Sequence, residues 1–206
     1  MRKTACYNNR MRTQSGFTLL ELMVTIVIGG ILLAVGLPSM NRFALKSAES
    51  KAATELLSAL VQARSEAVAR NATVTICRRD FYTAETTPRC AADGGSWSQG
   101  WIVYQDADAT FDASEPDASA DIVAVFDPVG ETSPTGDGDT FAIVAALTFP
   151  SRMQFLPSGR AGELARFTVC ESTGSLPARQ LDVEMSGRAT TSELSKSATQ
   201  AACAVT

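Results

Sequence analysis

The sequence of 206 residues contains no histidine and no pair of cysteines separated by two residues. Without histidine, the chain lacks the imidazole that activates serine and cysteine nucleophiles. Without closely spaced cysteines or histidines, it also lacks the usual ligands of a zinc site. We therefore expect no metal, no cofactor and no catalysis of these kinds.

Acidic residues are absent from residues 1–16, and residues 17–37 carry Glu21 as their only charge. As a helix, this 21-residue apolar stretch would span about 31 Å, close to the roughly 30 Å hydrocarbon core of a bilayer. The leader of residues 1–16 is basic and is expected to stay in the cytoplasm. Everything after residue 37 is then exported.

The features around Gly16 occur in the reverse of the order found in a secretory signal peptide. A signal peptide has its small-residue cleavage site after the apolar core, whereas Gly16 precedes the apolar run and Glu21 follows five residues later. This order resembles the type IV prepilin signal. The resemblance implies that a prepilin peptidase cleaves after Gly16 and methylates Phe17, and that the apolar helix later joins a filament core.

Glu21 is unusual because a carboxylate within hydrocarbon is expensive and normally has a functional partner. The prepilin resemblance implies that this partner is the new amino terminus of a neighbouring subunit. The alternative is a plain signal anchor in which Glu21 lies shallow, near the membrane interface.

Glycines and a proline near the end of the apolar run are expected to weaken the helix. Gly29, Gly30 and Gly36 each cost ~1 kcal/mol relative to alanine. Pro38 removes the hydrogen bond to the carbonyl of Ala34. By analogy with pilins we expect this stretch to loosen on assembly; a simple kink is the alternative.

Five cysteines are present, and Cys6 lies in the leader. The other four belong to the exported part, where an oxidising compartment makes disulfides the default. Four cysteines allow three pairings. We favour Cys77–Cys90 and Cys170–Cys203, because each pair encloses a short, turn-rich segment.

Removal of the leader leaves 14 Lys+Arg against 22 Asp+Glu, a net charge of −8. This acidic balance argues against a broad electrostatic surface for nucleic acid. A local basic patch remains open.

Beyond residue 37 the pattern stays helical to Asn71 and then changes to a period of two. One face of the 38–71 helix is apolar and is expected to pack on an apolar surface; it carries Ala52, Leu56, Leu60, Ala63 and Ala67. Residues 72–206 are β-rich, with strand patterns at 73–77, 101–104, 122–126, 166–170 and 181–185, and an ambiguous apolar run at 141–149. We predict an α+β fold in which an antiparallel sheet packs on one long N-terminal helix.

Four short motifs follow the prepilin signal: ARSEAV (63–68), WSQGWIV (97–103), FLPSGR (155–160) and MSGRA (185–189). In this order and spacing they resemble the GspH/FimT family, which comprises minor pilins of type IV pili and minor pseudopilins of type II secretion systems. The resemblance implies a type IV pilin-like fold.

The same resemblance implies a structural subunit, not an enzyme, that helps to initiate or cap a type IV pilus. The implied partners are the prepilin peptidase, other minor and major pilins and the inner-membrane assembly platform. The chain would cross the inner membrane once, with its C-terminal domain in the periplasm, before it joins the filament. We prefer a pilus because a loop-rich domain with disulfides suits exposure; a type II secretion pseudopilus is the alternative.

Some FimT-like minor pilins are implicated in DNA uptake through a C-terminal glycine-arginine motif that carries further arginines. Here Gly187-Arg188 matches the start of the motif, but the next basic residue is Lys196. One arginine on an acidic domain supplies little of the multi-phosphate contact that affinity needs. DNA binding therefore stays an alternative, with Arg160, Arg179 and Arg188 as candidate contacts.

Two other motifs have structural interpretations. Gly159-Arg160 and Gly187-Arg188 are expected to mark turns or bulges at strand ends, where glycine supplies the backbone and arginine faces solvent. Trp97 and Trp101 are expected to lie in the core and a turn, with a ligand-stacking platform as the alternative.

Residues 106–117 are dense in carboxylates and superficially resemble a calcium loop. Phe111, however, occupies the position where such a loop requires glycine, so we favour a solvated surface loop. A membrane-anchored periplasmic enzyme is the remaining alternative, and it would have to depend on carboxylates such as Asp106 and Asp108.

Overall fold

A computed structural model describes residues 17–80, 88–91, 97–106, 116, 121–129, 141–146, 151–171 and 176–203. For residues 35–41, 141, 142 and 144–146, the backbone alone is described. The chain divides into two compact units, Met1–Phe43 and Ala44–Thr206. Helix α1 (Leu19–Arg70) contributes its first part to one unit and its second part to the other.

The first unit contains the beginning of α1. The hydroxyl of Thr18 accepts a hydrogen bond from the N–H of Glu21 (3.2 Å), so Thr18 caps the helix. The backbone remains helical through Gly29, Gly30 and Pro38. The loosening expected at this stretch is therefore not present in the isolated chain, and loosening on assembly stays a prediction.

In the second unit, α1 ends at a Schellman motif. Asn71 has a φ of 50°, in the left-handed region that asparagine tolerates. The N–H groups of Asn71 and Ala72 bond to the carbonyls of Val68 (3.4 Å) and Ala67 (3.2 Å), respectively. The helix thus stops beside the asparagine that the sequence indicates.

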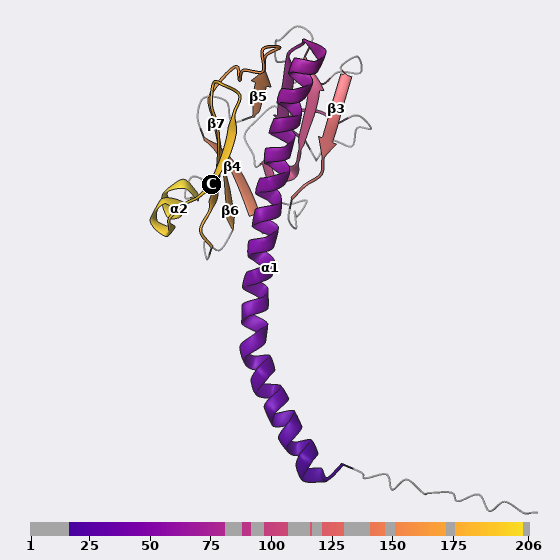
Figure 1. Ribbon diagram of the computed structural model, residues 1–206, viewed down its shortest axis with the longest axis vertical. Coiled ribbons are helices and arrows are strands. Elements are labelled where there is room, and N and C mark those ends of the chain that lie inside the picture. The colour runs from indigo at the N-terminus through magenta and orange to yellow at the C-terminus, as the bar shows by residue number, and fades with distance from the viewer. Residues whose placement is uncertain are drawn as a thin grey trace, which may run out of the picture. The chain divides into compact units, whose positions relative to one another are not determined.

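Strands in the described residues form two antiparallel sheets of four strands, where the sequence led us to expect one sheet (Figure 1). The first sheet has the order β3-β2-β1-β5. It consists of β1 (Val74–Arg78), β2 (Trp101–Gln105), β3 (Asp121–Phe126) and β5 (Arg152–Phe155). The second has the order β4-β6-β7-β8. It consists of β4 (Phe141–Ala146), β6 (Ala165–Glu171), β7 (Arg179–Val183) and β8 (Ala189–Glu193).

The predicted strands 73–77, 101–104, 122–126 and 166–170 correspond closely to β1, β2, β3 and β6, and the ambiguous run contains β4. The strand predicted at 181–185 corresponds to β7, which begins and ends two residues earlier. The sequence did not predict β5, β8, the short helix η1 (Trp97–Gln99) or helix α2 (Lys196–Cys203).

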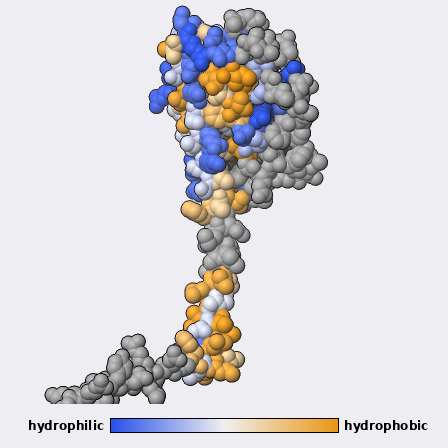
Figure 2. Space-filling model, turned by 90° about the vertical axis from the view of Figure 1, so that its right-hand side faces the viewer, coloured by the Kyte–Doolittle hydropathy of each residue, from blue (hydrophilic) through white to orange (hydrophobic). Residues whose placement is uncertain are grey.

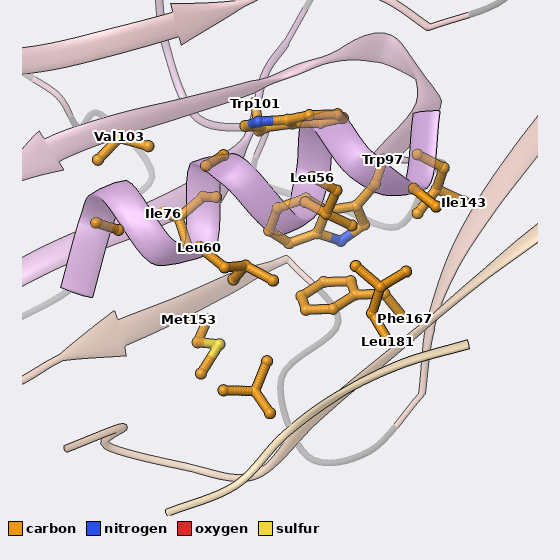
Figure 3. Close-up of a cluster of buried hydrophobic side chains, with 14 of the residues drawn as sticks. Leu56, Leu60, Ile76, Trp97, Trp101, Val103, Ile143, Met153, Phe167 and Leu181 are labelled. Carbon is orange, nitrogen blue, oxygen red and sulfur yellow. The ribbon is translucent and has the colours of Figure 1, made fainter. Parts of the chain in front are cut away.

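Among the described residues, the larger of two buried hydrophobic clusters lies between the second part of α1 and the two sheets (Figure 3). The apolar face predicted for the helix is buried, at Ala52, Leu56, Leu60, Ala63 and Ala67. Trp97 meets Phe167 edge-on with ring centroids 4.9 Å apart, and Trp101 stacks on Phe126 at 5.5 Å. Both tryptophans are fully buried, which confirms that they belong to the core.

Candidate functional sites

Phe17 and the first part of α1 expose apolar side chains on all sides of the helix. Their exposed fractions range from 48% at Val24 to 82% at Phe17, which precedes the helix. The large ones are Phe17, Leu19, Leu20, Leu22, Met23, Val24, Ile26, Val27, Ile28, Ile31, Leu32 and Leu33. A helix that is apolar all round is stable only when other protein or lipid surrounds it. This segment is therefore a candidate assembly surface.

Within the described residues, no helix is both long enough and apolar enough to cross a membrane. The membrane span at residues 17–37 therefore stays a prediction.

Glu21 lies in the first turn of α1, three residues after the capping residue Thr18. A carboxylate at this position interacts favourably with the helix dipole. Glu21 is exposed, so its pairing with a neighbouring amino terminus stays a prediction. The cleavage residue Gly16 lies outside the described residues, as does the side chain of Pro38.

Both favoured disulfides are present in the second unit. Cys77–Cys90 connects β1 to the segment that precedes η1, and Cys170–Cys203 ties α2 to β6. The hydroxyl of Thr199 on α2 also accepts a hydrogen bond from the N–H of Ala178 (2.9 Å). The C-terminal helix is thus attached to the second sheet, as expected from Cys203.

Asp106 is a buried structural carboxylate. It accepts hydrogen bonds from the hydroxyl of Thr75 (2.9 Å) and the amide of Gln154 (2.8 Å), and it is only 2% exposed. Substrate has no access to such a group. Asp108 and the rest of the acidic loop, apart from Asp106 and Pro116, lie outside the described residues.

Two glycine turns have the same hydrogen-bond pattern. The N–H of Gly159 bonds to the carbonyl of Leu156, and the N–H of Gly187 bonds to that of Glu184, both at 2.8 Å. Both glycines have a positive φ, 74° and 76°, which favours glycine over other residues. As predicted, these motifs form turns, and the arginines that follow them are exposed.

The two turns touch each other beside α1. A Cβ atom on Gly187 would lie 2.0 Å from the carbonyl oxygen of Gly159 and 3.0 Å from Nε of Arg64. A Cβ atom on Gly159 would lie 2.9 Å from Cγ2 of Val68. Nε of Arg64 donates a hydrogen bond to the Gly159 carbonyl (2.9 Å). Glycine is therefore required here for close approach as well as for its backbone conformation.

The three arginines proposed as DNA contacts lie in different settings. Arg160 and Arg188 follow the two touching turns and have no carboxylate partner among the described residues. Arg179 on β7 instead lies 3.9 Å from the carboxylate of Glu49 on α1. Burial raises the pKa of Glu49, and the charge of Arg179 opposes that rise. Arg179 therefore already pairs with a carboxylate of its own chain.

A groove of about 630 Å³ lies on the other side of α1, between the helix and the end of β3. We call it the α1–β3 groove. Its lining residues are Ala48, Lys51, Ala52, Glu55, Val125, Phe126, Asp127, Pro128 and Val129. Nothing in the sequence pattern indicated this groove, because its two walls are about 70 residues apart in the chain.

Replacement of Gly187 by alanine should destabilise the second unit by about 2–4 kcal/mol, because the new methyl group meets a backbone oxygen and the positive φ disfavours alanine. Urea unfolding of residues 44–206, which contain the buried core, measures this loss. Gly162→Ala is the matched control, since its Cβ would come no closer than 3.6 Å to any atom. Equal stabilities of the two variants would contradict the close contact of the turns.

The stability of the second unit should also depend on pH through the carboxyl group of Glu163. Burial raises the pKa of Glu163 to about 7, against the opposing charge of Arg152. A raised carboxylate pKa means that ionisation disfavours the folded state, so stability should fall as pH rises from about 5 to 8. The Glu163→Gln variant has no carboxyl group at this position and should not lose this stability. Across this pH range, the free energy of unfolding of the wild-type protein should therefore fall by about 1 kcal/mol more than that of the variant, after allowance for solvent screening. The free energies of unfolding of the wild-type protein and the variant, measured at pH 5.5 and 8, test this prediction. Equal changes in the two free energies between these pH values would contradict it.

Comparison with known proteins identifies the family. The family model described as "Type II transport protein GspH" matches residues 52–187, and that of the prokaryotic N-terminal methylation motif matches residues 11–37. No curated protein matches the chain.

Two crystal structures of the type IV minor pilin FimU from Pseudomonas aeruginosa (strain PAO1) are similar to this chain. One covers 78% of this chain and 95% of FimU at 19% identity, with a TM-score of 0.47. The other covers 74% and 94% at 19% identity, with a TM-score of 0.46. The family follows from the GspH match, which extends over more than half of the sequence: the chain belongs to the GspH family.

Proposed function

We propose that this protein is a minor pilin, a processed structural subunit that helps to initiate or cap a type IV pilus. The observation that carries the proposal is the first part of α1, whose apolar side chains are exposed and lie within the match to the N-terminal methylation motif, residues 11–37. Before assembly this helix anchors the subunit in the inner membrane, with the second unit in the periplasm. On assembly it packs among the helices of other pilins.

Processing prepares the end of the helix for this packing. The prepilin peptidase cleaves after Gly16, and Phe17 becomes a methylated amino terminus just ahead of the helix cap at Thr18. Glu21 follows four residues later, about 6 Å along a helix axis. A neighbouring subunit displaced by about that distance brings its amino group beside Glu21, which neutralises both charges in an apolar filament core. The inner-membrane assembly platform would add subunits one by one.

The alternative machine is a type II secretion system, in which the same processed helix would serve a minor pseudopilin. The two disulfides support the pilus, because they hold peripheral segments onto the sheets of a domain that faces the cell exterior. In either machine the role is structural and requires no cofactor.

An in-frame deletion separates the two machines. We expect loss of surface pili and twitching motility with unchanged type II secreted protein in the medium, because a pilus that lacks its initiating subunit does not assemble. Pili are counted by electron microscopy, and secreted protein is assayed in the same strain. A strain that keeps its pili but loses secretion would assign the protein to the pseudopilus, and the wild-type gene supplied in trans is the control.

Gly16→Ala should block cleavage, because the prepilin peptidase requires glycine before the scissile bond. Immunoblotting should show the uncut chain, and mass spectrometry should find no methylated Phe17. Ser15→Ala, one residue earlier, is the matched control and should be processed normally. Loss of the leader from the Gly16→Ala protein would contradict the prepilin interpretation.

A further inference from the structure

A carboxylate occupies the position where α1 first becomes buried. Along the helix, Glu49 is the first buried side chain among those that the structure describes. Before it, the described side chains of the first unit are mostly exposed, and those on the side shown in Figure 2 are mostly hydrophobic. After it, Ala52, Ala53 and Leu56 are at most 3% exposed and belong to the core. The first buried position of the helix is thus an ionisable one.

Glu49 faces the second sheet, where Arg179 on β7 is its ion-pair partner. The side chain of Glu49 is 3% exposed, and its Oε1 lies 3.9 Å from Nε of Arg179. Both atoms are buried, and neither makes a hydrogen bond within the described structure. A direct hydrogen bond between them would require about 3.2 Å or less. The pair is therefore buried without the hydrogen bonds that normally compensate a buried charge.

Other ion pairs of this unit have better geometry. Nε of Arg166 lies 2.6 Å from the carboxylate of Asp182, and Nη1 of Arg79 lies 3.1 Å from that of Asp127. Both pairs form hydrogen bonds and remain in contact with solvent. The pair at Glu49 has neither advantage, so it gives the helix a weak attachment at this point.

The surrounding charges do not favour an ionised Glu49. Burial raises the pKa of Glu49; Arg179 and Lys46 oppose this rise, and Glu193 on β8 and Glu171 on β6 add to it. Three carboxylates thus face two cations. Either protonation of Glu49 or separation of the helix from the sheet relieves the cost of the buried charge.

We infer that Glu49 is a pH-dependent switch for local opening of the second unit. Its ionised carboxylate favours separation of residues 44–53 of α1 from the second sheet, and its protonated form favours packing. A carboxyl group that holds its proton more tightly in the packed state gives that state an advantage at low pH. The advantage is lost as pH rises above about 4.5, the ordinary pKa of this group. Opening should therefore increase between pH 5 and pH 8.

The opening ends where the core becomes continuous. Leu56, Ala59 and Leu60 are fully buried and hold the rest of the helix on the sheets. Residues 44–53 correspond to about 15 Å of helix. Because the first unit ends at Phe43, opening would lengthen the part of α1 that is free of the second unit by that amount. A subunit that moves from a membrane to a filament could use this freedom. That use rests on the proposed function, whereas the switch itself does not.

The competing interpretation is a simple ion pair that fastens α1 to β7. The two interpretations predict opposite effects of Glu49→Gln, which removes the charge and keeps the shape. If Glu49 is a switch, the variant packs more firmly, because no buried negative charge remains and Arg179 still has Glu193 opposite it on β8. If the pair is a simple fastener, the variant packs less firmly. The long separation and the missing hydrogen bonds favour the switch.

Thiol labelling of the full-length processed chain in detergent tests the switch. Ala53→Cys places a thiol at a buried position one turn after Glu49, and the four native cysteines of the processed chain are in disulfides. Its rate of reaction with a maleimide is divided by that of Ser58→Cys, an exposed position on the same helix, to remove the pH dependence of the thiol itself. This ratio should rise about threefold or more from pH 5 to pH 8.

Ala59→Cys is the control for global unfolding. Ala59 is fully buried beyond the proposed opening, so a thiol there should react slowly at both pH values. An equal rise in reactivity at Ala53→Cys and Ala59→Cys would show that the whole unit unfolds and would overturn the inference.

Charge variants supply the second test. In a Glu49→Gln background the ratio should be low and equal at pH 5 and pH 8, and Arg179→Gln should raise the ratio at pH 8, because the buried carboxylate loses its ion-pair partner. A Glu49→Gln ratio at pH 8 that equals or exceeds the wild-type ratio would overturn the inference. If Ala53→Cys does not fold, amide hydrogen exchange over residues 44–53 at pH 8 gives the same comparison between the wild-type chain and Glu49→Gln.

The outcomes also separate this inference from the proposed function. A ratio that rises with pH, together with intact pili after deletion of the gene, keeps the switch and refutes the minor pilin role. A ratio that does not change with pH, together with loss of pili, refutes the switch and leaves that role intact.

Discussion

Alanines on the buried face of α1 determine how closely the helix approaches the two sheets. Ala52, Ala59, Ala63 and Ala67 are at most 2% exposed, and their small side chains leave room for large residues such as Trp97 from the opposite side. This close packing gives both sheets one shared core. It also positions the two flanks of the helix beside β3 and beside the glycine turns, so the candidate binding surfaces depend on the same contact.

The sequence predicted those elements whose signals are local. The end of α1 follows from Asn71 and the change of period, and the central strands follow from apolar alternation. The sequence did not predict β8, because Ala189–Glu193 is mostly polar and forms an edge strand. It also did not predict β5, because that strand has only four residues. The division into two sheets depends on pairing between distant strands, such as β4 with β6, which no local pattern encodes.

For the candidate sites, too, the sequence predicted only the features that have local signals. Glycine followed by arginine correctly indicated two turns, but not that Gly159 and Gly187 touch, since 28 residues separate them. Arg179 shows the opposite case. The sequence made Arg179 a candidate DNA contact, whereas β7 places it 3.9 Å from the carboxylate of Glu49 on α1. The raised pKa of Glu163 likewise depends on burial, which the composition of its surroundings does not reveal.

The disulfide Cys170–Cys203 closes a covalent ring across 33 positions of sequence that contains β7, β8 and the turn at Gly187. The turn at Gly159 lies outside this ring. The two glycine turns are therefore stabilised differently. Noncovalent packing alone holds the turn at Gly159, whereas the turn at Gly187 is also held by a bond that forms only after export to an oxidising compartment. Completion of the surface that the two turns form is thereby coupled to the oxidative folding machinery of the cell envelope, and a newly translocated, reduced chain has not yet completed it.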